Sequence, residues 1–370
     1  MMKKTLLSPQ DKEKLDKLYI KIQEESNHFI GYPCNIDFDY SELFRFLKKP
    51  INNVGDPFVS SNYHVNTHEF EREVLKFFAK ITHAGKDFWG YVTNGGTEGN
   101  MYGLYLAREL YPEGIIYYSQ DTHYSVSKIL RILRMKSIMI RSQESGEIDY
   151  EDLRETIRIK RDFVPIILAN IGTTMKGAID NVKRIHDILD ELAISTHYIH
   201  CDAALCGMIL PFTIGAPGFD FRLGVDSISI SGHKFIGSPI PCGIAIARRQ
   251  NVDRIARSIE YVGTLDTTLS GSRNGITPLF LWYAIKRLDT NALKLRVKRC
   301  FEVADYAIEE FNKLKLNAWR NEYSTTVVFK RPAMEIVRKW QLASLKDIAH
   351  LVVMPHVTRE WIKRFLKDLQ

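Results

Sequence analysis

The chain has 370 residues, of which 45% are hydrophobic and 26% are charged, a composition that suits a globular protein with one large domain and a smaller one. Its net charge is +7, but the basic residues are scattered among 44 acids, which argues against a nucleic-acid-binding protein. The five cysteines form no CxxC pair, which argues against a disulfide framework and against a zinc site. The sequence has no long apolar run and no signal-peptide pattern, which argues against a membrane protein and favours the cytoplasm.

The first predicted element is an amphipathic helix over residues 8–27, whose apolar stripe is formed by Leu15, Leu18, Tyr19 and Ile22. We expect this stripe to pack against the body of the protein or against a partner subunit.

From about residue 67 to residue 250 the pattern alternates between helix and strand. Such alternation predicts a mostly parallel sheet with helices on both faces. The expected strands are 115–118, 137–141, 164–169, 198–201, 226–230 and 244–247, and the expected helices are 68–80, one from about 100, 124–135, 149–160 and 180–192.

After about residue 275 the pattern changes to that of a small α+β domain. The expected elements are helices at 277–288 and 291–314, a strand at 325–329, a helix at 333–342, a strand at 350–353 and a helix from Thr358. The chain is therefore divided into an N-terminal segment (1–50), a large α/β domain (51–275) and a small domain (276–370).

Lys234 follows the strand expected at 226–230 and precedes a turn rich in glycine and proline. An amine partly removed from water at such a position loses its proton readily and can form a Schiff base. A surface lysine at a strand end would produce the same pattern, so the segment alone leaves both interpretations open.

A glycine-rich loop, Asn94-Gly-Gly-Thr-Glu-Gly-Asn100, directly precedes the helix expected from about residue 100. Backbone N–H groups in such a loop can surround a phosphate, and a helix start favours negative charge. The loop matches neither GxGxxG nor a Walker loop. A plain glycine turn capped by Thr97 is the alternative.

Asp202 comes directly after the strand expected at 198–201 and is followed by Ala203 and Ala204. A buried carboxylate is costly unless it meets a cation, and a pyridinium nitrogen is such a cation. An aspartate in that place would keep pyridoxal phosphate an electron sink, and the alanines leave room for a flat ring. An aspartate that caps the next helix is the alternative.

His123, in Asp121-Thr-His-Tyr-Ser125, can stack its flat imidazole on a conjugated ring, although a histidine before a helix is more often a capping or surface residue. Thr173 and Thr174 follow the strand expected at 164–169, where their hydroxyls can bond the phenolic oxygen of such a ring. All of these groups fall at the carboxyl ends of expected strands, where open α/β sheets bind ligands.

Taken together, the motifs resemble those of the group II pyridoxal-phosphate amino-acid decarboxylases, and the resemblance extends from about residue 29 to residue 368. It implies a fold type I enzyme with a sheet of the seven-stranded, mostly parallel type, pyridoxal 5′-phosphate as cofactor, and a homodimer with shared active sites. The N-terminal segment would lie at the dimer interface. The matching motifs are Asn94–Asn100, Asp121–Ser125, His200-Cys-Asp-Ala-Ala204, Ser231-Gly-His-Lys234 and Ser270-Gly-Ser-Arg-Asn-Gly275.

The resemblance also implies a role for each matched residue. Lys234 would form the Schiff base, Asp202 would face the pyridine nitrogen and His123 would stack on the ring. Tyr261 is the candidate general acid. The other candidate cofactor residues are Gly96, Thr97, Ser231 and His233 at the phosphate, Ala204 and Thr173 at the ring, and Ser270, Ser272 and Arg273 from the neighbouring subunit.

Within this family the chain is most similar to the bacterial histidine decarboxylases, and the plant-type serine decarboxylases come second. Two stretches, 55–63 and 350–357, look more like the serine enzymes, and the first would line the side-chain pocket. Histidine, giving histamine and CO₂, is the expected substrate, and serine, giving ethanolamine, is the alternative. The candidate pocket residues are Asp56, Phe58, Tyr63 and His64, whereas His68 is expected at the surface.

Two other classes of function stay open on chemical grounds. One is another lyase or an aminotransferase on the same fold, because the pose of the substrate decides which bond breaks. The other is a non-catalytic relative that retains the fold. No metal site is expected.

Overall fold

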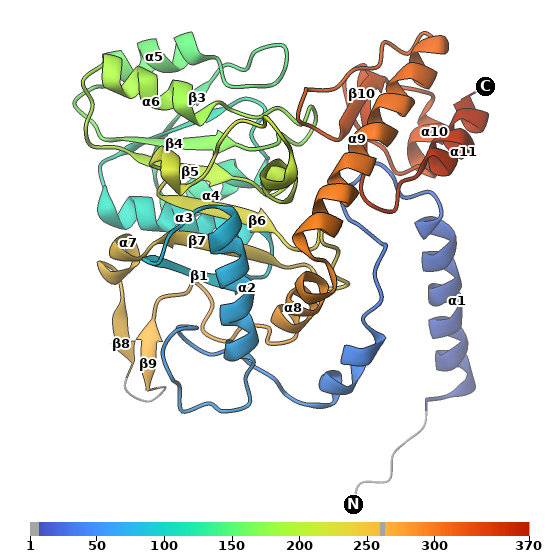
Figure 1. Ribbon diagram of the computed structural model, residues 1–370, viewed down its shortest axis with the longest axis horizontal. Helices are drawn as coiled ribbons and strands as arrows, with labels where there is room; N and C mark the ends of the chain where they lie inside the picture. The colour runs from blue at the N-terminus through green and yellow to red at the C-terminus, as the bar shows by residue number, and fades with distance from the viewer. Residues whose placement is uncertain (1–6, 260–262, 370) are drawn as a thin grey trace, which may run out of the picture.

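The central sheet has seven strands in the order β1-β7-β6-β5-β4-β2-β3, in a computed structural model that describes residues 7–259 and 263–369 (Figure 1). Six strands run parallel, and β7 is antiparallel to both of its neighbours. This arrangement confirms the expected fold class. The strands are β1 Phe88–Thr93, β2 Ile115–Ser119, β3 Lys136–Ile140, β4 Pro165–Asn170, β5 Tyr198–Asp202, β6 Ser227–Ser231 and β7 Gly243–Arg248.

Helices cover both faces of this sheet, because successive strand residues point to opposite faces. Ile166 and Leu168 of β4 belong to one apolar core with α3 and α4, whereas Ile167 and Ala169 belong to a second core with α2, α5, α6 and α8. The helices of the large part are α2 His68–Ile81, α3 Gly96–Leu110, α4 Ser125–Leu133, α5 Tyr150–Ile159, α6 Val182–Glu191 and α7 Arg249–Asp253. Helix α8 Thr277–Arg287, which was expected in the small domain, packs against α2.

The sequence analysis did not predict β1, although its strand is fully integrated in the sheet. Gly90 interrupts the apolar run of this segment, which weakens the strand signal. The structure explains the glycine: a Cβ at position 90 would lie 2.5 Å from the carbonyl oxygen of Ala245 on the paired strand. The other unpredicted strands are the hairpin β8 Arg257–Ile259 and β9 Thr264–Asp266, and β11 Ala343–Leu345.

The C-terminal part is built on a three-stranded antiparallel sheet in the order β10-β12-β11. Phe311, Phe329 and Phe365 pack edge to face in its core, with ring centroids 4.9 to 5.9 Å apart. This confirms the expected α+β character of this part. Its elements are α9 Thr290–Lys313, β10 Thr326–Lys330, α10 Met334–Lys339, β12 Ile348–Val352 and α11 Arg359–Leu369.

The N-terminal helix α1 spans Pro9–Ser26 and begins at Ser8, whose hydroxyl accepts a hydrogen bond from the N–H of Asp11 (3.2 Å). It lies at the edge of the molecule (Figure 1) and contains no buried residue. Leu18 and Tyr19 of its apolar stripe are 53% and 63% exposed. The predicted helix is therefore confirmed, but packing of its stripe on the chain's own body is wrong.

Within the described residues, the regular structure also includes four short 3₁₀ segments, namely Ser41–Lys48, Cys206–Met208, Leu210–Phe212 and Phe221–Leu223. None of the helices within the described ranges is both long enough and apolar enough to span a bilayer.

A buried ion pair between Glu71 and Arg273 joins four segments of the large part. Both side chains are at most 1% exposed. Glu71, on α2, also accepts hydrogen bonds from the N–H of Val92 on β1 (2.8 Å) and from Asn53 (2.7 Å). Arg273 donates in addition to the carbonyl of Gly55 (3.0 Å). The pair thus fixes the irregular segments around residues 53 and 273 against α2 and β1.

Removal of one partner of this pair is expected to destabilise the fold strongly. In Glu71→Ala the guanidinium of Arg273 stays buried without a counter-ion, which costs about 3–5 kcal/mol in the free energy of unfolding measured in urea. Asp187→Ala is the control, because Asp187 pairs with Lys183 on the exposed side of α6 and such a pair contributes at most about 1 kcal/mol. Equal losses in the two variants would contradict the prediction.

Candidate active site

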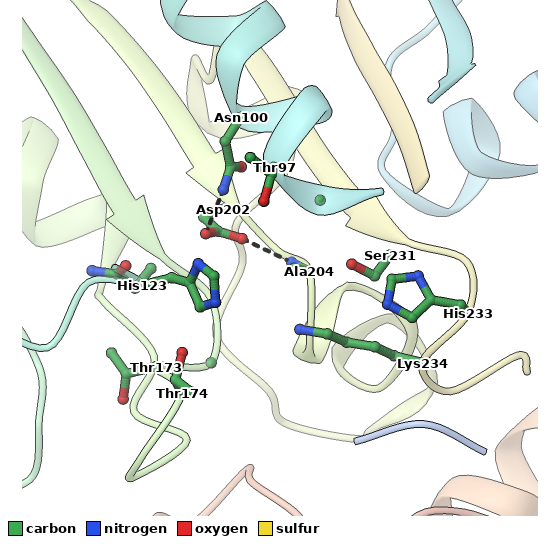
Figure 2. A pocket seen from close by; sticks show the side chains of 13 residues that line it. Thr97, Asn100, His123, Thr173, Thr174, Asp202, Ala204, Ser231, His233 and Lys234 are labelled. Atoms are coloured by element: carbon green, nitrogen blue, oxygen red, sulfur yellow. Dashed lines mark hydrogen bonds between the residues drawn. The ribbon is translucent and has the colours of Figure 1, made fainter. Parts of the chain in front are cut away.

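A cavity of about 150 Å³ lies at the carboxyl ends of the central strands (Figure 2). The register places Asn170 of β4 beside Asp202 of β5, and Asp202 beside Ser229 of β6, so that neighbouring strands end at the same edge. This is the edge at which the sequence analysis expected ligand binding. The cavity is lined by Gly96, Thr97, Asn100, His123, Asn170, Gly172, Thr173, Thr174, Asp202, Ala204, Ser231, His233 and Lys234.

Asp202 is the carboxylate of this cavity and is 8% exposed. Its Oδ2 accepts a hydrogen bond from the amide of Asn100 (2.7 Å), and its Oδ1 accepts one from the N–H of Ala204 (3.1 Å). Both bonds are donated by N–H groups, one to each carboxylate oxygen. The carboxylate is thereby held in place at the cavity wall.

Lys234 lies on the opposite side of the cavity from His123, and its amine points into the space between them (Figure 2). Burial lowers the pKa of this amine, and the nearby charge of Asp202 opposes the shift only in part. The backbone at this point is fixed by the N–H of Asn35, which donates to the carbonyl of Lys234 (3.0 Å). The interpretation as an ordinary surface lysine is therefore wrong.

The glycine-rich loop turns directly into α3. Gly95 has a φ of +146°, which favours glycine, and no side chain caps the helix start. The first N–H groups of α3 are thus available to an anion. His233 lies beside this helix start and engages the carbonyl of Cys242 through Nδ1 (2.8 Å), so Nε2 is the nitrogen left to face the cavity.

His123 forms the wall across from Lys234. Its Nδ1 lies 2.8 Å from the hydroxyl of Ser125, and burial lowers the pKa of the imidazole. Its neighbours Thr173 and Thr174 line the same wall, and the Thr173 hydroxyl accepts a hydrogen bond from the N–H of Ala178 (2.9 Å). The structure thus brings candidate residues from five separate stretches of the chain into one cavity.

The serine- and arginine-containing segment 270–273 lies outside this cavity. Ser270 contacts Glu98 (3.4 Å), and Ser272 is exposed and contacts Asn52 (3.1 Å). The expectation for Arg273 is wrong, because a guanidinium that is 1% exposed and paired with Glu71 cannot reach a second subunit. Tyr261 lies outside the described residues.

The candidate substrate-pocket residues also lie away from the cavity. Asp56 is buried and accepts hydrogen bonds from Trp89 (2.8 Å), Thr267 (3.0 Å) and the N–H of Phe58 (2.7 Å), so its role is structural. The ring of Phe58 packs edge-on against Phe88, with the ring centroids 5.8 Å apart.

Tyr63 lines a second cavity of about 720 Å³ beside β9, together with Leu265, Leu269 and Ser272. The two histidines of this region differ in their exposure to solvent: His64 is exposed, whereas His68 is buried and only 5% exposed. The surface location expected for His68 is therefore wrong.

Two asparagines of the cavity were not identified as site residues from the sequence. Asn100 lies four positions after Gly96, and this spacing places both on one face of α3. Asn170 is the last residue of β4, as Asp202 is of β5, and its amide bonds Asp180 (3.0 Å) and Ser119 (3.1 Å). Helical spacing could have identified Asn100 from the sequence, and its position at a strand end could have identified Asn170.

The lining of the cavity fits pyridoxal phosphate in its chemistry. An uncapped helix start suits the phosphate, a carboxylate suits the protonated ring nitrogen, and an amine of lowered pKa suits the aldehyde. Within the described ranges, no three His, Cys, Asp or Glu side chains are grouped so that they could hold a metal ion.

Comparison with known proteins points to the same cofactor. The conserved domain of pyridoxal-dependent decarboxylases matches residues 46–331. A histidine decarboxylase from Mesorhizobium japonicum is 49% identical over 356 residues, which is 96% of each chain. One from Morganella morganii is 49% identical over 353 residues, covering 95% of this chain and 93% of the relative.

Solved structures show the same architecture. An L-methionine decarboxylase from Streptomyces sp. 590 has a TM-score of 0.92 at 26% identity, covering 100% of this chain and 96% of that chain. A glutamate decarboxylase from Lactobacillus brevis, with a TM-score of 0.82 at 18% identity, covers 100% of this chain and 93% of that one, and shares the fold.

The lowered pKa of Lys234 can be measured on the cofactor-free protein. Because burial disfavours the ammonium form, Lys234 should reach half-modification by an amine-directed reagent at a lower pH than the exposed lysines of the same sample. Mass spectrometry of peptides labelled across a pH series provides the comparison. Labelling of Lys234 in step with the exposed lysines would contradict the prediction.

Proposed function

This chain belongs to the pyridoxal-dependent decarboxylase family, and we propose that it converts L-histidine to histamine and CO₂. The main structural support for this proposal is the cavity in which Asp202, Lys234 and the glycine-rich loop face one another. The substrate assignment is supported by relatives of 49% identity that extend over nearly the whole chain.

The chain's own residues have distinct parts in this proposal. Asp202 would face the ring nitrogen of the cofactor, Lys234 would attach the cofactor covalently, and His123 would stack on the ring. When bound, pyridoxal phosphate supplies the electron sink that accepts the electron pair left at Cα as CO₂ departs. The residues assigned to the phosphate are Gly96, Thr97, Ser231 and His233, and those assigned to the ring surroundings are Ala204 and Thr173.

The lowered pKa of the Lys234 amine supports its part, because only the unprotonated amine is a nucleophile. Beside the substrate's reacting carbon, the amine of Lys234 would also be a group that can hold or move a proton. Tyr261 is proposed as a further general acid.

Serine is the alternative substrate, and its main support was the stretch 55–63. Asp56 is occupied by three internal hydrogen bonds and does not line the cavity. This weakens the argument that the stretch selects serine, and favours histidine.

We further propose a homodimer in the cytoplasm. The exposed apolar stripe of α1 is unsuited to water and suits a second copy of the chain. Ser270 and Ser272 lie on an accessible segment from which they could contact the partner's cofactor. All five cysteines are free thiols, in keeping with a reducing compartment.

The proposed substrate is tested by measuring amine formation from L-histidine and from L-serine side by side, with saturating cofactor and no keto acid. We expect histamine, CO₂ in equal amount, and a far higher kcat/KM for histidine. Lys234→Ala is the control and should lose more than about 100-fold in kcat. Ethanolamine as the main product would overturn the substrate assignment, and absence of CO₂ release would overturn decarboxylation.

The proposed dimer is tested by placing charge on the apolar stripe of α1. The double variant Leu15→Glu/Leu18→Glu should dissociate at least about tenfold more readily in sedimentation velocity, because each leucine loses its apolar contact. Lys17→Glu, on the charged face of the same helix, is the control. A monomeric wild type, or a double variant that dimerises as tightly as the control, would contradict the proposal.

A further inference from the structure

A line of buried hydrogen bonds leads from the interior of the large part to Asp202. The hydroxyl of Tyr198 bonds Ser227 (2.9 Å), Ser227 bonds Nδ1 of His200 (2.8 Å), and Nε2 of His200 bonds the carbonyl of Asn100 (3.1 Å). The amide of Asn100 then bonds the Asp202 carboxylate (2.7 Å; Figure 2). The first four of these residues are at most 2% exposed.

The carboxylate at one end fixes the direction of the bonds in this line. A carboxylate only accepts, so Asn100 presents its NH₂ group to Asp202 and its carbonyl to His200. His200 must therefore carry its proton on Nε2, and its Nδ1 accepts from Ser227. The hydroxyl of Ser227 in turn accepts from Tyr198. Each donor thus points toward Asp202.

The surroundings keep the imidazole of His200 neutral, as this direction requires. Burial lowers the pKa of His200 to about 4, although the negative charge of Asp202 acts in the opposite direction. The neutral Nε2–H form satisfies all partners at once.

A glycine on α3 makes the line possible. A Cβ at Gly103 would lie 2.2 Å from Nδ1 of His200 and 2.8 Å from the hydroxyl of Ser227. Any larger residue at this position would push the helix away from β5 and β6 and separate Asn100 from His200. The close approach of helix and sheet is therefore part of the arrangement.

We propose that Asn100 and His200 are positioning residues that hold the Asp202 carboxylate charged and aimed at the cofactor. Successive N–H and O–H dipoles that point the same way strengthen one another and favour the negative charge at the end of the line. Neither residue contacts the substrate's reacting atoms in this account. The inference rests on the proposed function because it assumes that Asp202 faces the ring nitrogen.

Substitutions test the line through the affinity of the cofactor-free protein for pyridoxal phosphate, followed by absorbance. Asn100→Leu should raise the dissociation constant by about 10- to 100-fold, and His200→Phe by about 3- to 10-fold. His200→Gln retains an N–H donor toward Asn100 and should restore most of the affinity. His197→Phe, just before β5 and remote from the cavity, is the matched control.

Kinetics separate a positioning role from general damage. In Asn100→Leu we expect kcat for histidine to fall while KM stays nearly constant, because the line acts on Asp202 and not on the substrate. A wild type that neither binds pyridoxal phosphate nor releases CO₂ would overturn the proposed function itself. A normal wild type with Asn100→Leu and His200→Phe indistinguishable from His197→Phe would overturn only the positioning role.

A measurement on the wild-type protein tests the proposal even if the variants do not fold. Nitrogen-15 NMR of histidine-labelled, cofactor-free protein should show His200 as the neutral Nε2–H tautomer from about pH 5.5 to about pH 8. The Nδ1–H tautomer or an imidazolium in this range would reverse or break the line and overturn the proposal.

Discussion

The site depends on one constraint, which is the cost of keeping the carboxylate of Asp202 away from water. An ionised group in such a place must receive hydrogen bonds or meet a cation. Here the N–H of Ala204 and the amide of Asn100 supply the bonds, and the cavity side remains open to a cationic ring. Removal from water also acts on Lys234. Burial disfavours its ammonium form and thereby makes its amine reactive.

The fold meets this constraint by bringing α3 unusually close to the sheet. A Cβ at Gly99 would lie 2.2 Å from the hydroxyl of Ser229, and one at Gly103 would lie 2.2 Å from His200. Glycine on the helix and serine on β6 therefore set the distance at which Asn100 reaches Asp202. The same helix starts at the cavity, so that its first N–H groups and the carboxylate face one ligand.

Most of this arrangement could be predicted from the sequence because it follows the chain locally. Asp202 is the last residue of β5, Lys234 and His123 come a few residues after β6 and β2, and parallel strands bring such positions to one edge. The failures concern contacts over long separations in the chain. Neither the pairing of Arg273 with Glu71 nor the burial of His68 has a local signal, since both depend on how distant segments pack. The stripe of α1 predicted a helix but could not tell which surface covers it.

The central claim is that this cavity holds pyridoxal phosphate through Lys234. Borohydride reduction of the purified, cofactor-loaded protein, followed by peptide mass spectrometry, tests it most directly, because reduction makes the lysine linkage permanent. The account predicts a phosphopyridoxyl group on the peptide that contains Lys234. A modification confined to another lysine, or no modification after loading, would contradict it.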